Sequence, residues 1–166
     1  EPKGLLLAQP YEPPGLWTLR EDACRVWEEI ETRVVVVVGD RCPRAGLGFD
    51  FFDLLGHLGA SHRNLITLSS DEQGRPALEA DGLLALGLRP GEEPGPQIEQ
   101  WLPGEREDAL VVDSLDTRGI WRYADALIDV GVRGIHADRV FGAGPGVTSM
   151  GRWSDGTPVR EATIGR

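Results

Sequence analysis

The chain has 166 residues and a net charge of −10 at pH 7, with 40% hydrophobic and 27% charged residues. This length and composition predict one globular domain with its own core. The negative charge argues against nucleic acid and anionic membranes as partners, because both are bound through clustered Lys and Arg. With two cysteines and no long apolar stretch in the sequence, we expect a cytoplasmic protein.

The N-terminal part combines a proline-rich segment with a helix signal. Residues 1–17 are expected to form an extended arm, in which Leu5-Leu6-Leu7 can be a short strand. Thr18 and Glu21 have the Ser/Thr-x-x-Glu spacing of a capping box, and apolar residues follow at helical intervals. The pattern predicts a helix that ends near Thr32.

An unbroken run of valines, Val34 to Val38, is the strongest structural signal in the sequence. Valine is branched at Cβ, so it loses χ1 freedom in a helix and suits a pleated strand. The run does not alternate with polar residues, so both faces should be covered. That is typical of a central parallel strand.

The middle of the chain alternates helix and strand patterns. Apolar residues on one face predict a helix over 49–58, and 64–68 reads as a second strand. Pro76 at a first helical position and Gly87 after the last predict a helix over 76–86. Residues 87–108, rich in Pro, Gly and Glu, predict a long loop.

The last third of the chain continues this alternation. Residues 109–115 form an apolar run that ends in Asp and Ser and predicts a third long strand. The spacing of Ile120, Tyr123, Ala124, Leu127 and Ile128 predicts a helix closed by Gly131. A short strand over 132–136 and a small hairpin over 153–159 complete the pattern. We therefore expect one three-layer α/β/α domain with a mostly parallel central sheet.

Two acidic residues follow the strongest predicted strands. Asp40 comes after the valine run, and Asp113 ends the apolar run that begins at residue 109. Ligands in open α/β sheets bind at the C-terminal ends of strands, so these carboxylates are candidate catalytic residues. Converging carboxylates can bind a divalent metal or divide acid and base roles. The alternative is that each Asp caps the following turn or helix. Neighbouring candidates are Ser114, Asp116 and Arg118.

Two further features are candidates for chemistry. His136 precedes Asp138-Arg139 and is a candidate catalytic base, with a hydrogen-bonded structural role as the alternative. Residues 142–146 form a glycine-rich loop that could hold a phosphate through backbone N–H groups. The loop lacks the Lys-Ser/Thr of a P-loop, so a plain turn is the alternative.

Residues 39–48 and 110–119 together resemble the phosphorylase/hydrolase-like peptidases, which include hydrogenase-maturation peptidases and relatives of the spore germination protease. In that family a hydrophobic strand enters a Gly-Asn or Gly-Thr-Asp-Arg turn, as at Gly39-Asp40-Arg41, and a later strand ends Val-Asp-Ala, which Val112-Asp113-Ser114 resembles. The resemblance implies a peptidase-like fold with Asp40 and Asp113 at polar or metal positions. Ala45 and Gly46 replace the family's acidic loop residues, so only those two positions carry over.

Three functions follow from these patterns. The first is a hydrolase-like domain with a polar, metal-binding or acid–base pocket formed by Asp40 and Asp113. The second is a non-catalytic module that binds or assembles with another protein and was cut from a larger chain, because the sequence starts without Met and carries tryptophans suited to interfaces. The third is nucleotide binding at residues 142–146.

Overall fold

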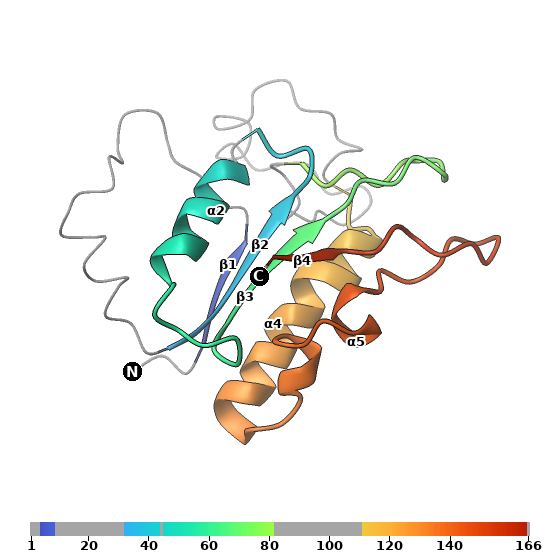
Figure 1. Cartoon of the computed structure of the whole chain (residues 1–166). Coiled ribbons are helices and arrows are strands. Elements are labelled where there is room, and N and C mark those ends of the chain that lie inside the picture. The colour runs from blue at the N-terminus through green and yellow to red at the C-terminus, as the bar shows by residue number, and fades with distance from the viewer. Residues whose placement is uncertain (1–3, 9–31, 44, 82–110, 166) are drawn as a thin grey trace, which may run out of the picture.

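The computed structural model describes residues 4–8, 32–43, 45–81 and 111–165. Within these ranges four strands form one mixed sheet in the order β1-β2-β3-β4 (Figure 1). β1 (Gly4–Ala8), β2 (Arg33–Gly39) and β3 (Arg63–Leu68) are parallel, and β4 (Thr163–Gly165) is antiparallel to β3. The expected α/β class is therefore confirmed.

β2 lies at the centre of the sheet, as the valine run predicts. It pairs with β1 on one side and β3 on the other, and all five valines are fully buried. Val34, Val36 and Val38 face one core cluster, and Val35 and Val37 face the other. Because both faces are covered, the strand needs no polar alternation.

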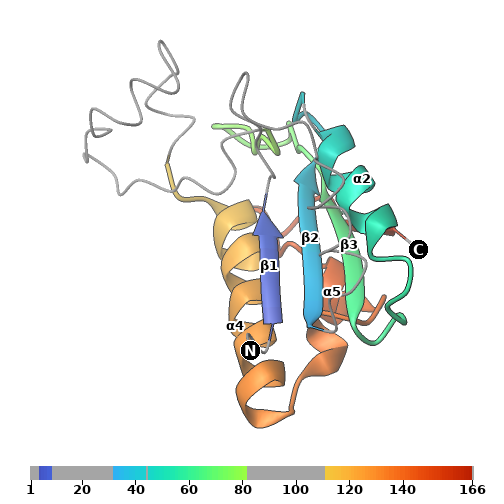
Figure 2. The ribbon, with the colours of Figure 1, turned by 90° about the vertical axis from the view of Figure 1, so that its left-hand side faces the viewer.

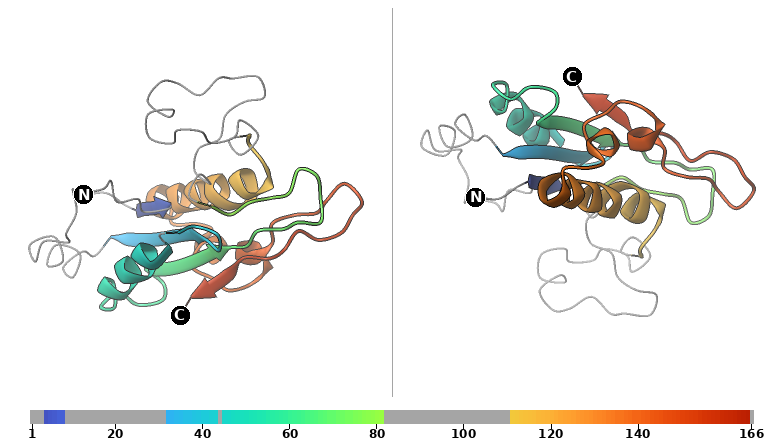
Figure 3. Two further views of the ribbon diagram at one scale, coloured as in Figure 1. Left: turned by 90° about the horizontal axis from the view of Figure 1, so that it is seen from above. Right: turned by 90° about the horizontal axis from the view of Figure 1, so that it is seen from below.

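Helix α2 (Ala45–Leu54) covers the first face through Phe52, while Leu55 follows it into the same cluster. The predicted helix over 49–58 is confirmed over 49–54, but α2 starts four residues earlier, at Ala45, and stops at Leu54. Figure 3 shows α2 and α4 on opposite sides of the sheet.

The second face is covered by a continuous helical segment. Its centre is α4 (Arg122–Ile128), flanked by π-helical stretches at Asp116–Trp121 and Asp129–Arg133. The predicted helix at 120–128 is confirmed, but it does not close at Gly131. Its last turn is capped by Gly134, in the left-handed conformation with φ 71°.

The remaining predictions in the C-terminal half have mixed outcomes. The predicted strand over 132–136 is wrong, because residues 132 and 133 complete the helical segment. The hairpin near 153–159 is confirmed: Trp153 N–H donates to the Thr157 carbonyl at 2.8 Å. The glycine-rich loop at 142–146 leads into the short helix α5 (Pro145–Thr148).

Two predicted elements are wrong over most of their described residues, and the structure gives the physical reasons. Residues 76–81 are not helical, because Leu78 pairs with Asp71 in an antiparallel bridge. The predicted strand over 109–115 does not continue through residues 112–115, because Val111 forms only an isolated bridge and the helical segment already begins at Ser114. Several predictions lie outside the described residues: the rest of the helix over 76–86, almost all of the helix from residue 18, residues 1–3 and 9–17 of the arm, the loop over 87–108 and residues 109–110 of the strand. In the described part of the chain, no helix has the length and apolarity to cross a membrane.

Gly134→Ala should lower the free energy of unfolding by about 1 kcal/mol, because an L side chain at a left-handed helix cap is strained. Gly46→Ala is the matched control: it lies in α2 with open space around its Cβ position, and should stabilise by about 0.5 kcal/mol. Urea denaturation followed by circular dichroism measures both. Equal effects of the two substitutions would contradict the assigned cap.

Candidate functional site

β2 and β3 end at the same edge of the sheet, and the helical segment that contains α4 begins at that edge (Figure 2). Gly119, in the first turns of the segment, packs on the end of β3. A Cβ at this position would lie 2.9 Å from Leu68 Cδ1, so any side chain here would require Leu68 or the helix to shift. The polar residues that follow β2 and β3 and those that start the helical segment therefore share this edge.

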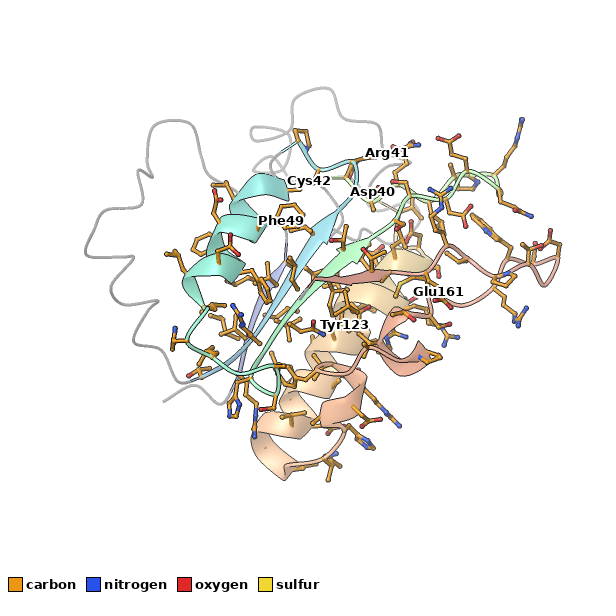
Figure 4. All side chains as sticks on the ribbon, in the orientation of Figure 1. Asp40, Arg41, Cys42, Phe49, Tyr123 and Glu161 are labelled. Atoms are coloured by element: carbon orange, nitrogen blue, oxygen red, sulfur yellow. The ribbon has the colours of Figure 1, made fainter. Side chains whose placement is uncertain are left out.

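Asp40 follows β2 and is held by Ser70, two residues after β3 (Figure 4). Both carboxylate oxygens of Asp40 accept from the Ser70 N–H at 3.0 Å, and Oδ1 also accepts from the Ser70 hydroxyl at 2.6 Å. The Ser70 hydroxyl in turn accepts from the Ala80 N–H at 3.0 Å. Asp40 thus joins the turns after the two strands, which is the structural role given above as the alternative to catalysis.

Asp113 and Asp116 form a reciprocal capping box at the start of the helical segment. Asp113 Oδ1 accepts from the N–H groups of Leu115 at 2.6 Å and Asp116 at 3.3 Å, while Asp116 Oδ2 accepts from the Asp113 N–H at 2.8 Å. Asp113 therefore caps a helix instead of ending a strand. The two carboxyl groups are held next to each other by this arrangement.

Burial and nearby negative charges raise the pKa of both carboxyl groups. Burial raises the pKa of Asp116 to about 6, helped by the nearby Asp113 charge and opposed by the hydrogen bond from the Asp113 N–H. Burial also raises the pKa of Asp113; its two backbone hydrogen bonds oppose the shift, and the Asp81 charge adds to it.

The sequence patterns do not single out two residues of this site, Asp81 and Ser70. Ser70 could have been found, because it follows a strand as Asp40 does.

Asp116 should make stability depend on pH. The pKa of Asp116 is about 6 in the folded state and near 3.8 in the unfolded chain. The stabilisation of the folded state by protonated Asp116 is therefore fully present below about pH 4 and is lost as the pH rises through 6. Asp116→Asn keeps the acceptor but removes this titration. We expect the variant to match the original near pH 4 and to be more stable by about 1 kcal/mol at pH 7, allowing for solvent screening. Urea denaturation at several pH values measures this, and a difference that does not change with pH would contradict it.

Ser114 and Arg118 lie beside the capping box, near Gly151. The Ser114 hydroxyl donates to the Met150 carbonyl at 2.6 Å. A Cβ on Gly151 would lie 3.7 Å from Arg118 Nε and 3.8 Å from Ser114 Oγ, which places both side chains around this glycine. Ser114 is thus a positioning group in this geometry, whereas the Arg118 side chain is exposed next to it.

His136 lies beyond the opposite end of the helical segment from Asp113. The intervening residues 114–133 are helical and span roughly 30 Å at about 1.5 Å per residue. His136 has a left-handed backbone with φ 63°, and its carbonyl accepts from the Arg139 N–H at 3.0 Å. The structure therefore separates His136 from the other candidates and gives its backbone a role in a turn.

Asp40 and Asp113 are the candidate ligands for a divalent metal. Among the residues with described positions, no group of three His, Cys, Asp or Glu side chains could hold a metal ion. The Asp40 carboxylate accepts hydrogen bonds from Ser70, and the Asp113 carboxylate accepts from two helix N–H groups. These residues therefore do not fit a metal site as they stand. No family model, curated protein or solved structure matches the chain.

Proposed function

We propose that the chain is a hydrolase-like domain of the three-layer α/β/α type with a mostly parallel sheet, and that it acts through a polar site at the edge where β2 and β3 end. The observation that supports this most is the adjacent pair Asp113 and Asp116, both with a raised pKa. Two carboxyl groups whose pKa values are set apart by their surroundings can act as acid and base in one reaction. The resemblance to peptidases at Asp40 and Asp113 is consistent with this class.

In this proposal the two carboxyl groups have different roles. Asp116, with a pKa of about 6, keeps its proton longer and serves as the general acid, while Asp113 serves as the base. Arg118 is the cation available for a negatively charged group of the substrate or for charge that develops during the reaction. In the proposal, Asp40 and Ser114 position the turns at this edge of the sheet.

The test is hydrolysis of fluorogenic peptides and of p-nitrophenyl esters and phosphates. Asp116→Asn should lower kcat/KM at least about 100-fold, within the range of general acid–base catalysis, and remove the part of the pH profile near pH 6. Asp113→Asn should lower kcat/KM to a similar extent, because it removes the proposed base. The fold should be kept, since Asn still caps a helix. Asp125→Asn, on the exposed outer side of α4, is the matched control. Full activity of Asp116→Asn, or no hydrolysis of any probe, would contradict the proposal.

The second candidate function is a non-catalytic module that binds or assembles with another protein. The observation that favours it is Trp121, which is 49% exposed although tryptophan is a strong interface residue. Trp153 has a structural explanation, because its indole N–H donates to Asp71 at 3.2 Å. Size-exclusion chromatography with light scattering separates the two functions: Trp121→Ala should abolish assembly, and Asp116→Asn should leave it intact.

A further inference from the structure

Two loops project side by side from the edge of the sheet that carries the candidate site (Figure 1). The first loop, residues 71–80, follows β3, and the second, residues 152–160, comes before β4. We call them the β3 loop and the β4 loop. Both views in Figure 3 show them extending together away from the sheet. Two segments that are far apart in the sequence therefore meet along their length.

Asp71 and Trp153 join the two loops. Asp71 Oδ2, at the start of the β3 loop, accepts from the Trp153 indole N–H at 3.2 Å and from the Arg160 N–H at 2.8 Å. The Trp153 ring also lies directly on Gly74, because a Cβ built on Gly74 would overlap with ring atoms Cζ3 and Cε3. The same ring packs against the core cluster. Trp153 therefore holds the β4 loop to the β3 loop and to the core.

The base of the β3 loop is part of the candidate site. Ser70, which donates to Asp40, directly precedes the loop. The Ser70 hydroxyl accepts from the Ala80 N–H at 3.0 Å, which closes the base. Asp81 comes next in the chain, and its negative charge raises the pKa of Asp113. A movement of the β3 loop would therefore move a charge that acts on Asp113.

The base of the β4 loop contacts the start of the helical segment. The Gly151 carbonyl accepts from the Val159 N–H at 3.1 Å, which closes this loop. A Cβ on Gly151 would lie 3.7 Å from Arg118 Nε and 3.8 Å from Ser114 Oγ. The Ser114 hydroxyl also donates to the Met150 carbonyl at 2.6 Å, just before the loop. The two loop bases thus adjoin the same first turns of the helical segment.

We propose that Trp153 is a positioning residue for the pair Asp113 and Asp116, because it fixes the bases of the two loops relative to each other. This inference rests on the first proposed function, in which the pair supplies the base and the acid. Two acidic groups act on Asp113 or lie next to it: Asp81 after the β3 loop, and Asp116 on its own segment. If the loops separate, the Asp81 charge moves away and water reaches Asp113. Both changes lower the pKa of Asp113.

The first experiment is an NMR titration of the Asp113 carboxyl group in the full chain and in Gly74→Ala. The added Cβ requires the Trp153 ring or the backbone at Gly74 to move. The indole N–H resonance of Trp153 should therefore shift, and the apparent pKa of Asp113 should fall by at least about 0.3. Gly59→Ala is the matched control, since Gly59 is also a loop glycine but has open space around its Cβ position. An Asp113 pKa that is the same in Gly74→Ala as in the original protein would overturn the proposal.

The second experiment is a double-mutant cycle between Gly74 and Trp153. Trp153→Ala should by itself lower the pKa of Asp113, because it removes both the ring and the donor to Asp71. Without the ring, the Cβ of Gly74→Ala has no ring atoms to displace, so adding this substitution should have no further effect on that pKa. Additive effects would show that Gly74 and Trp153 act independently, and would overturn the joint positioning role.

Hydrolysis of the probes named above separates failure of the positioning role from failure of the proposed function. If Asp113 is the base, the acidic limb of the kcat/KM profile in Gly74→Ala should move to lower pH by the same amount as the pKa of Asp113. A lowered pKa with no hydrolysis by either protein supports the positioning role and contradicts the proposed function. Hydrolysis with the same pH profile and the same Asp113 pKa in both proteins overturns the positioning role alone.

Discussion

Tyr123→Ala should lower the free energy of unfolding by about 4 kcal/mol, a large part of the 5–15 kcal/mol typical of a domain. The ring is fully buried between α4 and the segment that contains α5 (Figure 4), so its removal leaves a cavity in the core. The phenol also donates to the Val147 carbonyl at 2.7 Å. Urea denaturation of the variant at neutral pH measures the loss.

Tyr123→Phe is the matched control, because it keeps the ring and removes only the hydroxyl. We expect a loss of about 1 kcal/mol, since the Val147 carbonyl still accepts from Arg122 Nη2 at 2.6 Å. The same guanidinium donates through Nη1 to the Ser149 carbonyl at 2.8 Å. Equal losses in the Phe and Ala variants would show that the hydroxyl, and not the volume of the ring, is what the core needs.

Asp71→Ala should cost about 2 to 3 kcal/mol, because it leaves several donors without an acceptor. The Asp71 carboxylate accepts from the Gln73 N–H at 3.0 Å, the Arg160 N–H at 2.8 Å and the Trp153 indole at 3.2 Å. It thereby joins the turn over 71–78 to the hairpin near 153–159. The expected local result is a changed indole N–H resonance of Trp153 in the NMR spectrum.

The acidity of Asp71 supplies a second measurement. Burial alone would raise its pKa, but the hydrogen bonds from Gln73, Arg160 and Trp153 outweigh it and lower the pKa below 3.8. Because the pKa of Asp71 is lower in the folded state, its ionised carboxylate stabilises the folded state above about pH 4. This stabilisation is lost as the pH falls through the pKa that Asp71 has in the folded state. The deficit of Asp71→Ala should therefore shrink in acid, while Asp71→Asn should cost only about 1 kcal/mol at pH 7. A deficit independent of pH would contradict this account.

The sheet was predictable where one local signal had no competitor. The valine run has no polar face, so it suits only a strand that is covered on both sides. In the structure this strand lies at the centre of the sheet. At residues 111–116 two signals compete: an apolar run favours a strand, and Asp113-x-x-Asp116 is a helix start. The structure follows the helix signal, because the capping box gives hydrogen-bond acceptors to N–H groups at the start of the helix. Asp113-x-x-Asp116 has the same spacing as the capping box at Thr18 and Glu21, so the sequence carries this signal.

Other features of the site depend on contacts between distant parts of the chain. The hydrogen bonds between Ser70 and Asp40 join residues 30 positions apart, and no periodicity or local spacing predicts them. The bridge between Asp71 and Leu78 likewise overrides the helix that Pro76 suggests. The placement of His136 far from Asp113 follows from the unbroken helical segment over 114–133 that lies between them and includes the first residues of the predicted strand over 132–136.

The contact between Gly119 and Leu68 has a consequence for how this edge can change. The last side chain of β3 rests directly on the helix backbone, so the height of the acidic pair above the sheet is fixed by a hydrocarbon contact. A larger residue at position 119 would require either the Leu68 side chain or the start of the helical segment, which carries Asp113 and Asp116, to move. Tolerance of mutation at Gly119 therefore reports whether the start of the helical segment can move relative to the end of β3.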